Sequence, residues 1–231
     1  MTLAFRPDVA SDHLRVDLTE WAGVYVVGDV HGCADALDRL LSVLEVTEDD
    51  LVLFVGDLIR KGPDSGRVVR RLRNADNMYS VRGNNEQKVL RGEKTVPSLD
   101  EDDLAWLRSL PVAISWDGGL IVHGGVDPRK PLDEHTVDDL QNARSLSPDG
   151  GYNRPFWYER YARVPRIFFG HTVLGEPVET QWAVGLDTGC VYGGSLSAYD
   201  LRRKRFHDVP ARRSGRSRSD SKIVSTRTIF E

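Results

Sequence analysis

Five short apolar runs in this sequence end at a glycine beside a polar side chain, and this recurrence constrains the fold more than any other feature. Such β-rich runs alternate with amphipathic helical patterns, which predicts β-α-β units and a mostly parallel sheet. Ligands bind at the carboxyl ends of strands in open α/β sheets, so we expect the five turns to converge. They read Gly28-Asp29-Val30-His31-Gly32, Gly56-Asp57, Gly83-Asn84, His123-Gly124-Gly125 and Gly170-His171-Thr172.

The two halves of the chain differ in pattern. In the first half we expect strands at 23–29, 51–57 and 78–84, with helices at 34–46 and 63–75 between them. After about residue 110 the connections shorten, and Asp117-Gly118 is a hairpin signal. There we expect a second, more antiparallel sheet. The sequence therefore predicts an α/β fold with two sheets in one domain. The strands of the second half are expected at 112–116, 119–125, 166–172, 182–189, 195–201 and 203–209.

Charge is distributed unevenly along the chain. Residues 201–231 contain 10 Lys and Arg against 3 Asp and Glu, whereas the whole chain has a net charge of −4. We expect residues 1–210 to form a single domain and residues 211–231 a basic tail that could be mobile. No aromatic residues are interleaved with the arginines to stack on bases, so we do not expect nucleic acid as a partner, although the basic tail leaves it open.

Hydropathy argues against a membrane protein. No apolar run approaches the ~20 residues that a transmembrane helix needs. The first 15 residues contain acids and a proline where a signal peptide has an apolar core. We therefore expect a cytoplasmic protein with no membrane partner.

The side chains at the five turns form a coherent set of metal donors. They are two carboxylates, three imidazoles and one amide, and oxygen and nitrogen donors without thiolates suit hard-to-borderline divalent metals. Taken alone, each residue could simply belong to a turn or be a satisfied polar group, but five such turns in order favour a site. The three histidines outside these turns are assigned to the surface: His13, His135 and His207.

The turn motifs resemble those of the calcineurin-like metallophosphoesterase superfamily. They are most similar to the branch that holds phosphoprotein phosphatases and bacterial diadenosine tetraphosphatases. The resemblance covers residues 24 to about 200 and implies a four-layer αββα sandwich of two mixed β-sheets flanked by helices. The motifs that carry it are GDVHG (28–32), GDLIRKG (56–62), GNNE (83–86), HGG (123–125) and GHT (170–172).

The resemblance also implies a centre with two divalent metal ions. By motif, Asp29 and His31 would bind the first ion and Asp57 would bridge both. The second ion would be completed by Asn84, His123 and His171. Manganese is the metal we expect first, with iron, zinc, nickel or cobalt as alternatives.

The implied reaction is attack on phosphorus by a hydroxide that bridges the two ions. The leading expectation is a phosphoester hydrolase similar to serine/threonine phosphatases, with a phosphoprotein or a nucleotide as its substrate. The alternative within this class is a dinucleoside polyphosphate hydrolase acting on compounds such as diadenosine tetraphosphate. The alternative from another class is a metal-stabilised binding protein with weakened catalysis.

This chain departs from the family at the position of the general acid. Asn85 stands where the family has histidine, and Arg60 stands where it has the aspartate that pairs with this histidine. An asparagine donates hydrogen bonds but cannot protonate a leaving alkoxide. Either another group or water supplies the proton, or the leaving group needs little help. Lys61 replaces a phosphate-binding arginine, and we expect Lys61 and Arg144 to hold phosphate oxygens, while Arg60 could turn towards the substrate.

An aromatic cluster lies in the loop-rich segment 144–165. Phe156, Trp157 and Tyr158 could stack on a nucleobase, but we favour packing in the core or in a covering loop.

Overall fold

Two β-sheets form the centre of the protein in the computed structural model, which describes residues 3–212 and 217–225. The first sheet has five strands in the order β11 (Arg205–Pro210), β10 (Ser195–Asp200), β2 (Val24–Val27), β3 (Leu51–Phe54) and β4 (Met78–Ser80). The second has six strands in the order β1 (His13–Arg15), β5 (Ala113–Trp116), β6 (Gly119–Val122), β7 (Arg166–Phe169), β9 (Ala183–Gly185) and β8 (Val178–Glu179).

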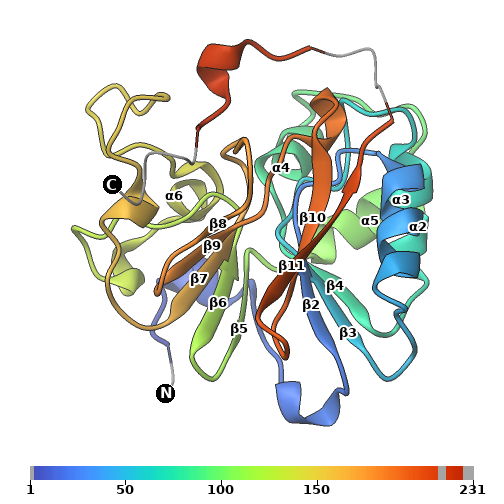
Figure 1. The fold of residues 1–231 in the computed structure, drawn as a ribbon, viewed down its shortest axis with the longest axis horizontal. Helices are drawn as coiled ribbons and strands as arrows, with labels where there is room; N and C mark the ends of the chain where they lie inside the picture. Colours follow the sequence, from blue (N-terminus) through green and yellow to red (C-terminus); the bar gives the residue numbers. More distant parts are fainter. Residues whose placement is uncertain (1–2, 213–216, 226–231) are drawn as a thin grey trace.

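Helices cover the outer face of each sheet (Figure 1). The α-helices are α1 (Pro7–Ala10), α2 (Ala34–Val43), α3 (Ser65–Arg73), α4 (Asn84–Leu90), α5 (Glu101–Ser109) and α6 (Val137–Asn142). Single 3₁₀ turns are η1 (Leu18–Glu20), η2 (Leu132–Glu134), η3 (Trp157–Glu159), η4 (Cys190–Tyr192) and η5 (Asp220–Lys222). None of the described helices is both long enough and apolar enough to cross a membrane.

Successive side chains of a strand point to opposite faces of its sheet, and hydrophobic residues lie on both faces. They form three hydrophobic interfaces, which separate four layers. In β2, Tyr25 and Val27 pack towards the helices, whereas Val24 and Val26 pack between the sheets. The outer interface of the second sheet contains Phe156, Trp157 and Tyr158, each no more than 1% exposed. The expected αββα sandwich of two mixed sheets is confirmed, and these three aromatic residues pack in the core.

The two C-terminal strands belong to the first sheet, so the expectation that they join the second sheet is wrong. Strand β10 pairs antiparallel with β2, with Ala198 opposite Val27, and β11 continues beyond β10. The second sheet is also mixed, because β6 and β7 run parallel. A strand's own pattern shows which residues are buried, but does not specify its partner strand.

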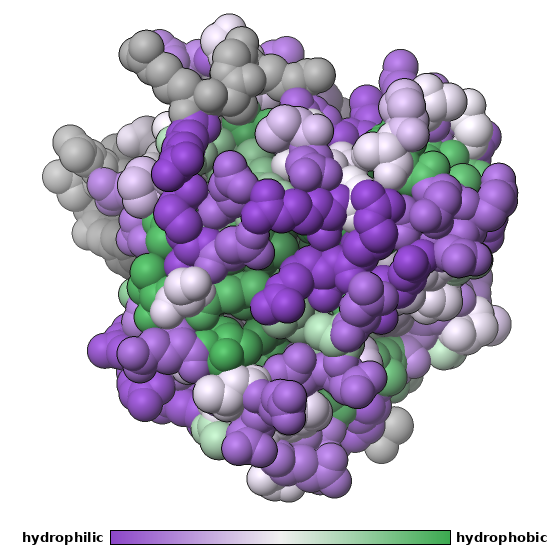
Figure 2. Space-filling view, turned by 90° about the vertical axis from the view of Figure 1, so that its right-hand side faces the viewer, coloured by the Kyte–Doolittle hydropathy of each residue, from purple (hydrophilic) through white to green (hydrophobic). Residues whose placement is uncertain are grey.

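The helical side of the first sheet is predominantly polar at its surface. Figure 2 shows mostly hydrophilic residues on this side, with hydrophobic residues between them. Arginines of α3 contact acids on neighbouring helices: Arg67 pairs with Asp35 and Asp38, and Arg70 pairs with Asp103. The solvent-facing side of α3 is thereby connected to α2 and α5.

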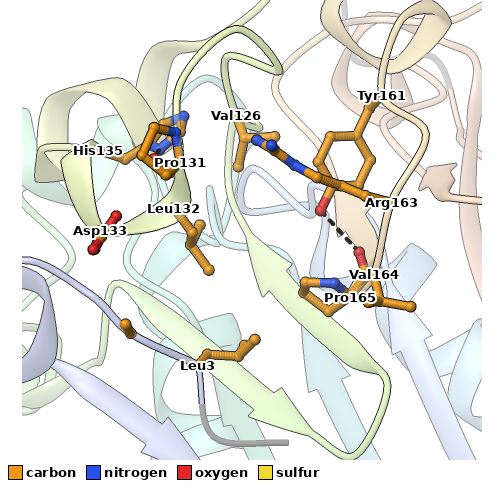
Figure 3. A pocket seen from close by; sticks show the side chains of 11 residues that line it. Leu3, Val126, Pro131, Leu132, Asp133, His135, Tyr161, Arg163, Val164 and Pro165 are labelled. Carbon is orange, nitrogen blue, oxygen red and sulfur yellow. Dashed lines mark hydrogen bonds between the residues drawn. The ribbon is translucent and has the colours of Figure 1, made fainter.

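A cavity of about 260 Å³ on the outer side of the second sheet contains His135 (Figure 3). Its Nε2 accepts a hydrogen bond from the Asp127 backbone nitrogen at 2.8 Å, and its Nδ1 donates to the Pro131 carbonyl at 3.0 Å. His135 is only 1% exposed, so its assignment to the surface is wrong. Both ring nitrogens thus stabilise the loop after β6 by hydrogen bonds. No predicted site residue lines the cavity.

Residues 217–225 of the predicted basic tail contact the body of the protein. Val224 is 6% exposed, and its backbone nitrogen donates to the Val173 carbonyl at 2.8 Å. Gly175 in turn donates to the Val224 carbonyl at 2.9 Å. Tail positions 213–216 and 226–231 lie outside the described residues.

Candidate metal centre

The five polar turns meet at one end of the two sheets. Three of them follow β2, β3 and β4 of the first sheet, and two follow β6 and β7 of the second. The donor atoms of Asp29, His31 and Asp57 lie within 4.8 Å of one another, and all three residues are buried. The convergence predicted from the strand ends is therefore present in the structure.

Asp57 lies between two histidines from different sheets. Its Oδ2 is 3.5 Å from His31 Nε2, and its Oδ1 is 3.4 Å from His123 Nε2. Asp29 adds an oxygen 3.8 Å from His31 Nε2. One short carboxylate thus presents its two oxygens to two separate groups of donors.

Backbone carbonyls fix which nitrogen of each imidazole faces the centre. His31 Nδ1 donates to the Ile59 carbonyl at 3.1 Å, and His123 Nδ1 donates to the Val55 carbonyl at 2.8 Å. The Nε2 atoms therefore point inward. His123 Nε2 is buried without a hydrogen-bond partner among the described residues. A buried ring nitrogen that has no hydrogen-bond partner and lies beside a carboxylate is suited to bind a divalent cation.

His171 and Asn84 are the remaining members of the predicted ligand set. The His171 backbone nitrogen lies 3.3 Å from both oxygens of Asp29, and its ring packs edge-on to His123 with centroids 5.1 Å apart. A β-carbon on Gly170 would overlap Asp29 Oδ1, so glycine is needed there. Asn84 donates from Nδ2 to Asn142 Oδ1 at 3.1 Å, and its Oδ1 accepts a hydrogen bond from Asn85 Nδ2 at 2.9 Å.

The buried acids and imidazoles strongly perturb one another. Burial and the neighbouring Asp187 raise the pKa of Asp29 well above its usual range. Burial alone would lower the pKa of His123, but the negative charges of Asp57 and Asp29 raise it to about 10. Burial lowers the pKa of His31 to about 3. Such a concentration of buried donors calls for a compensating cation.

Backbone conformations at the site are unusual. Five of the seven described non-glycine residues with positive φ are predicted site residues: His31, Asp57, Arg60, Lys61 and His171. A non-glycine residue in the left-handed region costs on the order of 1–3 kcal/mol, and such residues concentrate at functional sites. Surrounding contacts must therefore hold these turns in place.

Glu86 provides many of these contacts, and sequence reasoning missed its role. Its carboxylate accepts backbone N–H groups of Asp57 and Leu58 at 3.0 and 2.8 Å. It also accepts those of Ile59 at 3.2 Å and Gly83 at 2.8 Å. Glu86 thus ties the turn after β3 to the start of α4. An acid three residues after the glycine that precedes a helix was the available signal.

Two predicted substrate-binding cations lie against the histidine donors. Lys61 Nζ is 2.8 Å from His31 Nε2, and Arg144 Nη2 is 2.6 Å from His171 Nε2. In each pair the imidazole presents a lone pair to a positive group. A metal ion would use the same lone pairs and would leave both cations beside it.

Asn85 and Arg60, which replace the family's histidine and aspartate, contact each other directly. Arg60 Nη1 donates to Asn85 Oδ1 at 2.5 Å. Asn85 Nδ2 donates to Asn84 Oδ1 at 2.9 Å and also to Asp57 Oδ2. Asn85 is 4% exposed, and all its polar atoms are engaged in hydrogen bonds. No group in this pair can release a proton near neutral pH.

Comparison with known proteins links this site to a family. The model of the calcineurin-like phosphoesterases matches residues 23–213. A symmetrical bis(5'-nucleosyl)-tetraphosphatase from Acidovorax sp. is 28% identical over 80% of this chain and 95% of its own length. An asymmetrical bis(5'-nucleosyl)-tetraphosphatase from Halalkalibacterium halodurans is 28% identical over 81% of this chain and 93% of its own.

Solved structures show the same similarity. A crystal structure described provisionally as a diadenosine tetraphosphatase has a TM-score of 0.77 and 30% identity, covering 87% of this chain and 98% of its own. A serine/threonine phosphatase from Saccharomyces cerevisiae has a TM-score of 0.60 at 18% identity, covering 86% of this chain and 82% of its own. The latter similarity concerns the fold alone.

Proposed function

Because this chain belongs to the calcineurin-like phosphoesterase family and is a phosphoester hydrolase, we propose that it cleaves the phosphoanhydride bonds of dinucleoside polyphosphates. The observation that carries this proposal is the Arg60–Asn85 hydrogen bond at the position of the family's general acid. The names of the tetraphosphatase relatives also support it. The phosphoprotein substrate that we first expected remains the alternative.

The argument depends on the leaving group. A nucleotide that departs from a phosphoanhydride is a stable anion and needs little protonation, whereas the serine alkoxide of a phosphoprotein needs an acid. General acid catalysis typically contributes ~10²–10⁴-fold to a rate. A site without an acid therefore loses much more on phosphoserine than on a polyphosphate.

The donor residues gathered at the strand ends support two metal positions. Asp29 and His31 would hold one divalent ion with Asp57, which is shared with a second ion held by Asn84, His123 and His171. Two such ions supply Lewis-acid stabilisation of phosphoryl oxygens and acidify a water molecule. Manganese is the metal we propose. Lys61 and Arg144 would orient the reacting phosphate by contacts with its oxygens.

A three-substrate comparison tests the proposal. The manganese-loaded protein is assayed with diadenosine tetraphosphate, p-nitrophenyl phosphate and a phosphoserine peptide. We expect the first two to be cleaved and the peptide to react at least 100-fold more slowly than the tetraphosphate. Equal rates on peptide and tetraphosphate would favour the phosphatase alternative. Metal binding without cleavage of any of the three substrates would favour a binding protein.

A further inference from the structure

The C-terminal segment 217–225 brings Arg218 close to the metal centre. Val224 forms a parallel bridge with Leu174, three residues after His171. Arg154 adds a hydrogen bond to the Ser225 carbonyl at 3.1 Å. Figure 1 shows this segment in red at the top of the molecule. The segment is therefore anchored to the loop that carries a predicted metal ligand.

Arg218 is held between two tyrosines. Its Nη1 donates to the Tyr192 hydroxyl at 3.1 Å, and its Nη2 donates to the Tyr152 hydroxyl. The guanidinium lies 5.0 Å from the centre of the Tyr192 ring and 5.4 Å from that of Tyr152. Its Nε donates to the Lys222 carbonyl at 3.0 Å. Of the five N–H donors of an arginine, these contacts use three and leave two for a ligand.

The same two rings also contact the cations at the metal centre. Lys61 Nζ lies 5.6 Å from the centre of the Tyr192 ring, and Arg144 lies 4.5 Å from that of Tyr152. As described above, Lys61 and Arg144 reach His31 and His171. The three cations and the two tyrosines therefore form an arch, which we call the cation arch, from one predicted metal ligand to another.

The cation arch brings three positive side chains together. Within residues 3–212 and 217–225, no direct salt bridge joins Lys61, Arg144 or Arg218 to a carboxylate, although the charges of Lys61 and Arg218 oppose the rise that burial causes in the pKa of Asp187. Burial lowers the pKa of Arg144, and the nearby charge of Arg218 also lowers it, whereas the charges of Asp187 and Asp29 oppose this shift. Three cations close together, none of them in a direct salt bridge, favour a ligand with several negative charges.

We propose that Arg218 is a substrate-specificity residue that binds the phosphates of a polyphosphate beyond the one that reacts. This inference rests on the proposed function. Lys61 and Arg144 adjoin the predicted ligands and suit the reacting phosphate, whereas Arg218 lies one aromatic ring further out. A monophosphate is too short to use both positions, but a chain of phosphates can contact them together.

Binding and turnover of Arg218→Ala test this proposal, with Lys222→Ala as the matched control. Lys222 is an exposed cation of the same segment, and only its backbone carbonyl contacts Arg218. Calorimetry measures Kd for a diadenosine tetraphosphate analogue with non-hydrolysable methylene bridges on the manganese-loaded protein. We expect Arg218→Ala to raise Kd at least tenfold and Lys222→Ala to change it less than twofold. Arg218→Lys should lie between the two, because it keeps the charge but loses the planar fork.

Turnover measurements on two substrates distinguish a loss of substrate specificity from a general loss of activity. Arg218→Ala should lose at least tenfold more kcat/KM on diadenosine tetraphosphate than on p-nitrophenyl phosphate. Equal losses on both substrates, an unchanged or lower Kd, or an equal effect of Lys222→Ala would overturn the proposal. If the wild type cleaves no tetraphosphate, the proposed function fails, while the Kd comparison still decides whether Arg218 binds polyphosphate.

Discussion

Arg60 donates a hydrogen bond to the side-chain oxygen of Asn85, at the position where the family has a histidine and its aspartate partner. The amide group of Asn85 is turned by this contact towards Asp57 and Asn84. Asn85 and Arg60 keep a fixed protonation state near neutral pH, whereas the histidine–aspartate pair of the family can act as an acid and a base. The consequence of this difference is chemical rather than structural, because both positions remain well packed and hydrogen-bonded.

The wild-type rate should depend steeply on the leaving group. We expect rapid hydrolysis of p-nitrophenyl phosphate and slow hydrolysis of alkyl phosphates, because only the alkoxide requires protonation. A series of aryl and alkyl phosphates gives the dependence directly. A shallow dependence would show that another group already supplies the proton.

Restoring the pair should restore alkyl ester hydrolysis. Asn85→His alone should help little, since Arg60 beside the new imidazole disfavours its protonated form. Asn85→His with Arg60→Asp should raise the alkyl ester rate more than the aryl rate, by up to about 10²-fold. Kinetics on one aryl and one alkyl ester suffice, and an equal gain on both esters would count against a general acid at this position.

Removing the shared carboxylate should weaken both metal positions. Asp57→Asn should lower metal content and activity together, because Asp57 faces both His31 and His123. Elemental analysis of the purified variant measures the content. His31→Ala should chiefly lose one ion and His171→Ala the other. Full metal occupancy with wild-type turnover in Asp57→Asn would contradict the ligand assignment.

Lys61 should act on every substrate alike. Its ammonium group adjoins His31 Nε2, so Lys61→Ala should reduce kcat/KM by a similar factor for p-nitrophenyl phosphate and diadenosine tetraphosphate. Steady-state kinetics on both substrates measure the two factors. A loss confined to the tetraphosphate would place Lys61 on a recognition surface away from the reacting phosphorus.

Glu86→Gln should destabilise the turns that carry the ligands. The amide cannot accept all four backbone N–H groups, and one unsatisfied buried group costs about 1–3 kcal/mol. We expect a lower free energy of unfolding in urea and a lower metal affinity. Glu93→Gln, which alters an exposed acid after α4, serves as the control. An unchanged unfolding curve for Glu86→Gln would refute this role.

The convergence of the predicted donor residues was predictable because each of them is encoded locally. Asp29, Asp57 and His171 each stand within three residues of a strand end, so a short motif carries both the turn and the side chain. Parallel strands bring together the turns of each sheet, and the packing of the two sheets joins the two groups. The strands predicted from the sequence extend into these turns, beyond the strand ends in the structure. The reason is that the glycine and polar residues of the turns are compatible with a strand pattern.

Contacts that form only when other parts of the chain fold back were not predictable. Glu86 needs the turn after β3 before its four contacts exist, and His135 is buried only because its loop folds back on Asp127. Arg218 reaches Tyr152 and Tyr192 through a segment whose composition is typical of a solvated tail. For Glu86 and Arg218, most partners lie outside the window that a local pattern covers.

Strand β10 also protects the strand that carries the first predicted metal turn. One of the two edges of β2 is covered by β10, with Val27 opposite Ala198. A ribosome releases the amino-terminal residues first. The nascent chain therefore exposes an unpaired edge of β2 until residues 195–200 have been synthesised, and such edges pair readily with other chains. A product truncated before β10 would keep this edge exposed and would be prone to aggregation.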